Sequence, residues 1–386
     1  MSDFLDPISG TINFILNGVA QVFFMGSPLV GIIFVVALAI NSKRAAAFAV
    51  IGSIAGSLVG LALGIELIPA SLSSPDNALT YGIFGFNSVL TAIALGDTFF
   101  EKGRSATTAA VIGALVTGFI TASLIWFTKI FGLPVETSAF VLTTWMFLFA
   151  AKKFSGVKLA GPPPAPKQRS TLLKNPQDTE KKEPLRLSEF TAGGFVKLIF
   201  TGIAQVFFQE NWKTGVLIFI GLTVATIPLN PYGFPVQYPI YFAGITAFIG
   251  TLSATLAAIA FKADRSSILI GLYGFNGTLT ALAVMGVFLG FFWPINPFNG
   301  APINLIVMLF ATAFSTVVTA FIGTITSRFN LPTLTGPFVF TAWLIILGAK
   351  IFPSIAQATL SLLPIGSSGL LLLTSHLGLI ATIILH

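Results

Sequence analysis

Six uncharged polar residues lie inside long apolar stretches of the chain, where a polar group is costly unless a partner satisfies it. They are two glutamines, two asparagines and two threonines: Gln21, Gln205, Asn87, Asn276, Thr137 and Thr335. Lys, Arg, Asp and His are nearly absent from the centres of the same stretches. The chemistry that this set allows is hydrogen bonding to a small uncharged molecule, because a proton relay or an ion filter needs ionisable groups or rings of carbonyls.

These six residues belong to three sequence motifs, and each motif occurs twice. The paired segments are 18–24 with 202–208, 85–91 with 274–280, and 133–145 with 331–343. In the third pair, seven of thirteen positions are identical. The copies are separated by 184, 189 and 198 residues, so the register drifts only by small insertions. One half of the chain is therefore a duplicate of the other.

Composition indicates that the elements carrying these motifs lie in a lipid bilayer. Hydrophobic residues make up 55% of the 386 residues and charged residues only 9%, against about 25% charged in an ordinary soluble domain. Many apolar runs reach the ~20 residues that cross a bilayer. The absence of cysteine excludes disulfides, thiolate catalysis and zinc–thiolate clusters. We expect an integral membrane protein, located in the cell (plasma) membrane and inserted by its own helices without a secretory signal.

The net charge of +7 is concentrated between the two halves. Ten of the twenty Lys and Arg residues, but only four acids, lie between Lys152 and Lys197, around a proline-rich run at 161–166 that should be extended. A solvated cytoplasmic loop that follows the positive-inside tendency explains this balance better than a nucleic acid or an anionic lipid partner. We expect no nucleic acid partner.

The apolar blocks predict an all-α polytopic membrane protein. The expected domains are a first membrane repeat at 1–151, a basic Pro-rich linker at 152–195, a second membrane repeat at 196–352, and an apolar C-terminal segment at 353–386 that is a candidate extra span. Each repeat holds at least five apolar blocks, and the first block carries a polar interruption typical of a broken helix. An odd number of crossings per half makes the repeats inverted, with the solute path at their interface.

Proline beside threonine makes the third motif a candidate site. Pro134 and Pro332 donate no backbone hydrogen bond and each should free a carbonyl one turn earlier, while Thr137 and Thr335 add hydroxyls three residues on. The alternative is that each proline merely starts a helix and each threonine bonds its own backbone. Two copies in register favour the site. Glu136 and Glu66 are acidic exceptions, which we expect to be interfacial and solvated.

Four phenylalanines share the duplicated motifs with an amide. They are Phe24, Phe86, Phe208 and Phe275. Two facing rings make a slot that fits a planar solute through its π-face and offers no replacement ligands to a hydrated ion. A single phenylalanine in a membrane helix more often faces lipid, so the argument depends on the pairing with glutamine or asparagine.

The motifs resemble those of the urea transporter family. The likeness rests on the two Gln-Val-Phe-Phe segments, on Gly-Leu-Tyr-Gly-Phe-Asn-Gly-Thr-Leu at 271–279 and on the paired Leu-Pro-x-x-Thr-x-Pro-Phe signature, and covers roughly 12–150 and 196–350. It implies a channel-type urea facilitator that works passively, without ions, ATP or a cofactor. It also implies a homotrimer with one pore per protomer, built from two inverted repeats of about five transmembrane helices plus a re-entrant helix each.

The same resemblance assigns roles to residues of this chain. Phe24, Phe86 and Leu90 match the slot at one mouth, and Phe208, Phe275 and Leu279 match the slot at the other. Gln21 and Gln205 match positions that bond the amide groups of urea, and Thr137 and Thr335 match the hydroxyls of an oxygen ladder at the central constriction, with Val206 beside them. The first signature has Ala139 where the second has Pro337, so its helix geometry should differ. Gln205 replaces a glutamate of some relatives, which bears on selectivity.

Other interpretations stay open from the sequence. A channel for short amides, ammonia or water is the nearest alternative, although the only histidines, His376 and His386, lie in the C-terminal segment. A membrane-embedded enzyme is less favoured, because no His/Asp/Glu grouping has the spacing of a catalytic or metal site. Orientation is open too, since the basic linker favours the cytoplasm whereas the resemblance places it outside.

Overall fold

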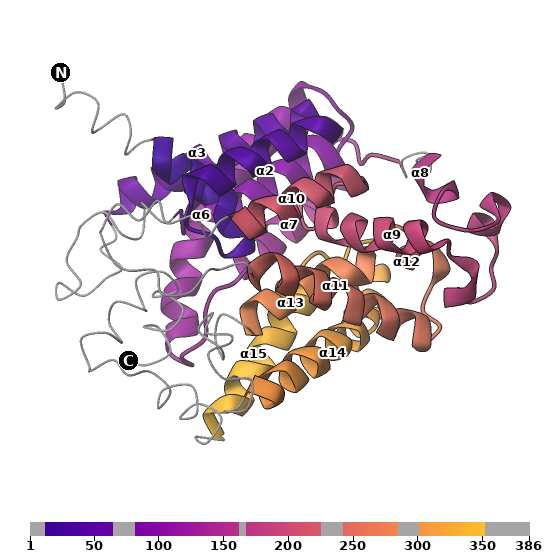
Figure 1. Ribbon diagram of the computed structural model, residues 1–386. Helices are drawn as coiled ribbons and strands as arrows, with labels where there is room; N and C mark the ends of the chain where they lie inside the picture. Colours follow the sequence, from indigo (N-terminus) through magenta and orange to yellow (C-terminus); the bar gives the residue numbers. More distant parts are fainter. Residues whose placement is uncertain (1–11, 65–81, 162–166, 225–241, 285–300, 352–386) are drawn as a thin grey trace. The chain divides into compact units, whose positions relative to one another are not determined.

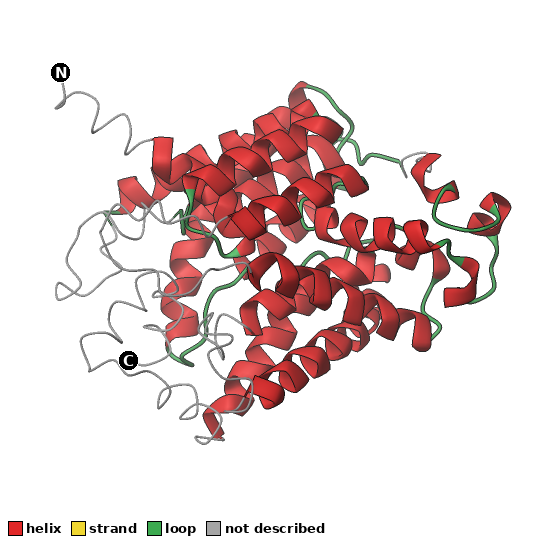
Figure 2. Ribbon diagram, viewed as in Figure 1, coloured by secondary structure: helices red, strands yellow, loops and turns green. Residues whose placement is uncertain are grey.

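The computed structural model describes residues 12–64, 82–161, 167–224, 242–284 and 301–351 (Figure 1). These residues form helices joined by loops, and none of them belongs to a strand of a sheet (Figure 2). The predicted C-terminal segment at 353–386 and Glu66 lie outside the described residues. The all-helical class predicted from the sequence is confirmed for the described part of the chain.

The described residues pack as two compact units. The first unit holds residues 12–161 together with 322–339, and the second holds the described part of 167–321 together with 340–351. Both Leu-Pro-x-x-Thr segments therefore belong to the first unit, although they come from opposite halves of the sequence. The repeat boundaries at 1–151 and 196–352 remain a prediction.

The first unit is built from five long or medium helices and two short ones. Its elements are the helix Ile12–Phe23, whose last turn is η1 (Gln21–Phe23), then α2 (Pro28–Asn41), α3 (Lys43–Leu63), α5 (Gly85–Ile93), η3 (Ala94–Thr98), α6 (Arg104–Lys129) and α7 (Ser138–Ala151). Ser42 accepts a hydrogen bond from the Ala45 N–H and so caps α3, while Pro28 begins α2, where its missing N–H costs nothing.

The second unit begins inside the predicted linker. Its elements are α8 (Lys167–Ser170), η4 (Pro176–Glu180), η5 (Leu187–Glu189), α9 (Ala192–Gln205), α10 (Trp212–Val224), α11 (Phe242–Ala260), α12 (Arg265–Leu269) and α13 (Leu272–Val284). Two further helices, α14 (Ala301–Ser327) and α15 (Gly336–Ile351), have residues in both units. The part of the linker from 167 onward is thus folded, and the proline-rich run expected to be extended lies outside the described residues except for Gly161.

Four described helices are long and apolar enough to cross a membrane: Lys43–Leu63, Arg104–Lys129, Ala243–Ala260 and Leu305–Ser327. A fifth crossing results if Ile12–Phe23 and Pro28–Asn41, which are bent by 71° at their break, count as one span. This bend agrees with the broken helix expected for the first apolar block.

Burial follows the pattern of a protein surrounded by lipid. Large apolar side chains such as Trp126 and Ile130 on and after α6 are exposed, by 66% and 76%. Threonines such as Thr117 and Thr121 on the same helix are buried, and each bonds a backbone carbonyl four residues earlier. Small and hydroxyl residues inside with apolar residues outside are typical of membrane helix packing. The second unit repeats this pattern at Thr251 and Phe261.

Each half folds its first helix back against the next through a glycine. In α2, a β-carbon at Gly31 would lie 2.1 Å from the carbonyl oxygen of Leu16, and in α10 a β-carbon at Gly215 would lie 1.8 Å from that of Phe200. Only glycine allows the two backbones to approach so closely. The close crossing places the two Gln-Val-Phe-Phe segments, residues 21–24 and 205–208, at the turn between the crossing helices.

Candidate functional site

The two Leu-Pro-x-x-Thr segments have the same backbone. Before each proline, the Leu133 N–H bonds the Thr128 carbonyl and the Leu331 N–H bonds the Thr326 carbonyl, both at 3.0 Å. Each segment then turns through a residue with positive φ, Glu136 at 49° or Leu334 at 51°. A non-glycine residue in this region is strained, and such strain clusters at functional sites. The shared conformation is evidence that the turn is conserved between the halves for a reason.

The prolines lie in these turns and not inside helices. α6 ends at Lys129 and α7 begins at Ser138, so Pro134 interrupts no helical hydrogen bond. The prediction that each proline frees a helix carbonyl one turn earlier is therefore wrong. Instead, the carbonyl oxygen of Pro332 itself accepts a hydrogen bond of 2.8 Å from the indole nitrogen of Trp145. The tryptophan of the first copy thus holds the turn of the second.

The second proline of the signature makes no difference to the start of the helix. Val141 and Val339 make equivalent backbone hydrogen bonds of 3.1 Å to the carbonyls of Thr137 and Thr335. Pro337 occupies the second position of α15, where an N–H has no partner inside the helix. Ala139 can therefore replace it, and the helix geometry expected to differ between the copies is alike in these bonds.

The two repeated threonines meet. The Oγ1 atoms of Thr137 and Thr335 lie 2.6 Å apart in a hydrogen bond, and each side chain is only 2% exposed. Thr137 is the residue before α7, yet its side chain makes no capping bond to its own helix. The alternative that this threonine only bonds its own backbone is wrong. Two positions that are 198 residues apart in the sequence form one buried polar pair.

Asn87 fixes the first of these turns. Its Nδ2 donates to the carbonyl oxygen of Glu136 at 3.0 Å, and its Oδ1 accepts from the N–H of Phe140 at 3.1 Å. Both groups of the buried amide are used, so α5 holds the turn and the first residues of α7 together. Sequence reasoning singled out Asn87 as polar but assigned it no role. The duplicated Gly-Phe-Asn motif was the available signal.

The two Gln-Val-Phe-Phe segments also share a backbone. Phe24 and Phe208 have φ of 62° and 61°, and each N–H bonds the carbonyl of the glutamine three residues earlier at 2.9 Å. Each segment contacts the helix carrying the next motif at a pair of glycines. A β-carbon at Gly18 would lie 3.2 Å from the Gly85 α-carbon, and one at Gly202 would lie 3.3 Å from that of Gly274.

Comparison with known proteins gives a family match over most of the chain. The family model described as urea transporter matches residues 6–152 and 196–368, and so leaves out almost the whole predicted linker. The chain belongs to the urea transporter family. It is 23% identical over 361 residues to urea transporter 1 of Ovis aries, and the alignment covers 91% of this chain and 80% of that protein. Urea transporter 1 of Mus musculus and of Rattus norvegicus are 23% and 24% identical, with the same coverage.

Membership of the urea transporter family confirms the resemblance drawn from the motifs and the placement in a membrane. The family is one of transport rather than catalysis. Within the part of the chain that the structure describes, no group of three His, Cys, Asp or Glu residues could hold a metal ion. The pore-forming roles of individual residues stay predictions.

The predicted site residues of this urea transporter homologue are divided between the units. The first unit holds Gln21, Phe24, Phe86, Leu90, Thr137 and Thr335, and the second holds Gln205, Val206, Phe208, Phe275 and Leu279. Leu90, Val206 and Leu279 are fully buried or nearly so, whereas Phe24, Phe86 and Phe208 are half-buried. The place of Val206 beside the threonines remains a prediction, because it would join the two units.

The side chains of the two Gln-Val-Phe-Phe segments differ in their partners. Gln205 donates from Nε2 to the carbonyl of Ile270 at 2.8 Å, just before α13. Gln21 has a buried Oε1 without a hydrogen-bond partner among the described residues. The Phe24 ring lies edge-on to that of Phe338, with centroids 6.1 Å apart. The Gln205 amide is therefore anchored, whereas the buried Oε1 of Gln21 can accept a hydrogen bond from a donor.

Glu136 is buried, which contradicts the expectation of a solvated carboxylate. Its side chain is 4% exposed, and neither carboxylate oxygen has a hydrogen-bond partner within the described part of the chain. The Glu136 backbone is held by the bond from Asn87 Nδ2 to its carbonyl oxygen. The equivalent residue of the second copy is the buried Leu334.

Proposed function

We propose that this protein moves urea passively across the membrane through a narrow, channel-like path. The single observation that carries the proposal is the buried hydrogen bond of 2.6 Å between Thr137 and Thr335, which joins the two copies of the signature. Family membership and the names of the relatives support urea as the solute.

The chemistry of the pair suits a neutral, donor-rich solute. A hydroxyl can donate and accept, so a urea molecule can exchange the bond between Thr137 and Thr335 for bonds from its own N–H groups and carbonyl. Exchange of one hydrogen bond for another costs little, whereas an ion would lose its hydration without gaining charged ligands. The uncharged pair therefore favours urea over ions.

The flanking residues would receive and align urea before and after this point. On this proposal Phe24, Phe86 and Leu90 form one slot, and Phe208, Phe275 and Leu279 form the other. Gln21 and Gln205 offer amide oxygens to the urea N–H groups, and the anchoring of Gln205 by Ile270 supports a fixed acceptor there. Val206 is proposed as the apolar residue beside the threonine hydroxyls at the central constriction.

The wider architecture belongs to the same proposal. Two inverted repeats of about five transmembrane helices plus a re-entrant helix would enclose the path, which the matched turns at 136 and 334 support. A homotrimer in the plasma membrane, with one pore per protomer, is the assembly that we propose. The bilayer and urea are then the expected partners.

Stopped-flow light scattering on proteoliposomes tests the function. Vesicles with and without the protein are mixed with urea, acetamide, ammonia or glycerol, and the permeability to each is measured. We expect urea permeability well above that of empty vesicles, with a smaller gain for acetamide and none for glycerol. Urea flux equal to that of empty vesicles would refute the proposal, and a larger gain for ammonia would assign the path to a different solute.

A further inference from the structure

The folded part of the linker, residues 167–191, forms a compact cap on the second unit. Leu172, Leu173, Leu185 and Phe190 are buried in one apolar cluster with Leu198 of α9, Ile268 and Leu269 of α12, and Tyr273 of α13. The backbone is close enough to α9 that a β-carbon at Gly194 would lie 2.0 Å from the Leu172 carbonyl oxygen. We call residues 167–191 the linker cap.

One end of the linker cap is bonded to both sides of the second Gln-Val-Phe-Phe segment. Gln168 donates to the Thr201 hydroxyl at 3.0 Å and accepts from the Trp212 N–H at 3.4 Å. Arg169 forms a two-pronged ion pair with Glu210, with Nη2 2.7 Å from Oε2. Thr201 precedes Gln205 by four residues, and Glu210 follows Phe208 by two. The segment is therefore held before and after its turn.

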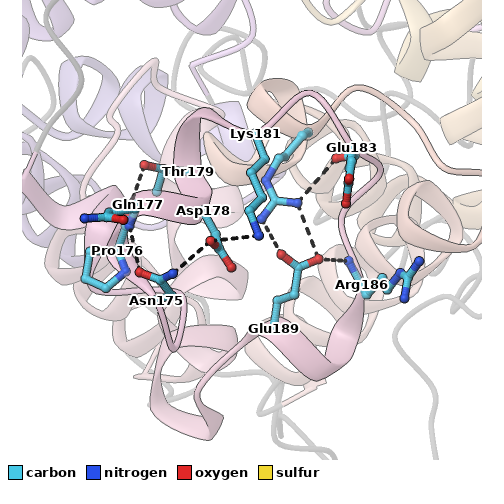
Figure 3. Close-up of polar contacts among 10 residues, drawn as sticks. Asn175, Pro176, Gln177, Asp178, Thr179, Lys181, Glu183, Arg186 and Glu189 are labelled. Carbon is cyan, nitrogen blue, oxygen red and sulfur yellow. Dashed lines mark hydrogen bonds and ion pairs between the residues drawn. The ribbon is translucent and has the colours of Figure 1, made fainter.

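The other end is bonded to the start of α12. Glu189 forms an ion pair with Arg265, whose side chain is 4% exposed, and Arg265 also donates to the Glu183 carbonyl at 3.3 Å. Figure 3 shows the Glu189 carboxylate beside Arg186, whose backbone N–H donates to it at 2.8 Å. α12 leads directly to Ile270, whose carbonyl receives the Gln205 amide.

Both ends of the linker cap thus fix the elements that carry the second set of site residues. α9 ends at Gln205 and is followed by the turn that carries Phe208, and α12 leads into α13 with Phe275. A solvated connector would need none of these bonds, and a buried arginine is costly unless its partner is held in place. Two-pronged arginine–carboxylate pairs give geometric specificity as well as energy.

We infer that the linker cap is a positioning element that sets the opening between Phe208 and Phe275, and thereby the size of amide that enters. Arg169 and Glu210 are positioning residues that act through the Gln205–Phe208 turn. The inference rests on the proposed function. Without the ion pair the turn becomes mobile, and amides bulkier than urea are excluded less strictly.

The test compares variants in proteoliposomes and by amide hydrogen exchange. The variants are Arg169→Gln, Glu210→Gln, and the exchanged pair Arg169→Glu with Glu210→Arg. Gln168→Ala is a milder variant that keeps the ion pair and serves if the others fail to fold. Lys102→Gln, which removes the ion pair of the exposed Lys102 with the largely buried Asp97 in the first unit, is the matched control.

We expect the ratio of N-methylurea to urea permeability to rise several-fold in Arg169→Gln and Glu210→Gln. Amide exchange at residues 204–210 should rise too, and the exchanged pair should restore both readings. Lys102→Gln should change neither. If Arg169→Gln, Glu210→Gln and Gln168→Ala all leave both the permeability ratio and the amide exchange at residues 204–210 unchanged, the inference is wrong. Amide hydrogen exchange can be measured whether or not the protein transports urea. A wild-type protein that passes no urea would therefore refute the proposed function, while the exchange data would still test the positioning role of the linker cap.

Discussion

The two Gln-Val-Phe-Phe segments share one backbone but are held in different ways. Both place a phenylalanine at a φ near 60°, after the same hydrogen bond to a glutamine carbonyl. Gln205 is anchored to Ile270 and flanked by bonds to the linker cap, whereas the Gln21 Oε1 has no partner among the described residues. The backbone therefore follows from the duplication, while the side-chain support is particular to each half.

The two Leu-Pro-x-x-Thr segments give the same lesson. Their turns match in hydrogen bonds and in the positive φ, yet one contains a buried carboxyl and the other a leucine. What both copies keep is the threonine pair at the centre. Features shared by both copies are thus candidates for transport itself, and features of one copy are candidates for support or tuning.

The largest effect should come from the glycines that both halves share. Gly31→Ala and Gly215→Ala each place a β-carbon far inside van der Waals contact with a backbone oxygen, 2.1 Å and 1.8 Å away. We expect each to lower the free energy of unfolding by about 1–3 kcal/mol or more, as overpacking does. Thermal unfolding in detergent measures this. Gly193→Ala, which meets nothing within 4 Å, is the control and should have little effect.

Exchange of the residue at positive φ tests the difference between the two turns. Glu136→Leu removes two buried oxygens without partners, and Leu334 shows that leucine adopts this backbone. We expect the variant to be more stable by about 1–3 kcal/mol. Leu334→Glu should be less stable by a similar amount. A loss of stability in Glu136→Leu would show that the carboxyl has a structural partner.

The two glutamines should separate stability from transport. Gln205→Leu leaves the Ile270 carbonyl without its donor, so we expect a stability loss of about 1 kcal/mol. Gln21→Leu breaks no such bond and should be nearly neutral in thermal unfolding. Both should lower urea permeability if both amides contact urea. Equal stability losses in Gln205→Leu and Gln21→Leu would contradict the conclusion that only Gln205 is anchored.

The smallest effect concerns the pH dependence of the linker cap. The Arg265 guanidinium holds the pKa of the Glu189 carboxyl below its ordinary value, with help from the Arg186 N–H and nearby Lys181. Stability from this ion pair is therefore present at neutral pH and lost as the pH falls through the lowered pKa of Glu189. Amide hydrogen exchange should show that residues 183–191 of the wild type lose protection at the acidic pH where Glu189 becomes protonated. Glu189→Gln should show weaker protection at pH 7 and little further change.

The sequence was sufficient to predict which positions of the two halves are equivalent, because motifs duplicated in register pair them. It did not predict that the Leu-Pro-x-x-Thr prolines lie in turns between helices. It could not show that Glu136 is buried, since burial depends on which elements pack around the turn, among them α5, whose Asn87 contacts it from 49 residues away. The fold of the linker was harder still to predict from the sequence. Its basic and proline-rich composition favours a solvated loop, and the signs of a cap were apolar residues among charged neighbours, such as Leu172, Leu173 and Phe190.

The most direct test of the central claim is a double-mutant cycle on the threonine pair. Thr137→Val, Thr335→Val and the double variant keep volume and remove the hydroxyls, and urea permeability is measured by stopped-flow light scattering. If the two hydroxyls form one step of the path, each single variant lowers permeability several-fold and the double variant is little worse than either. Unchanged permeability in all three variants would contradict the account.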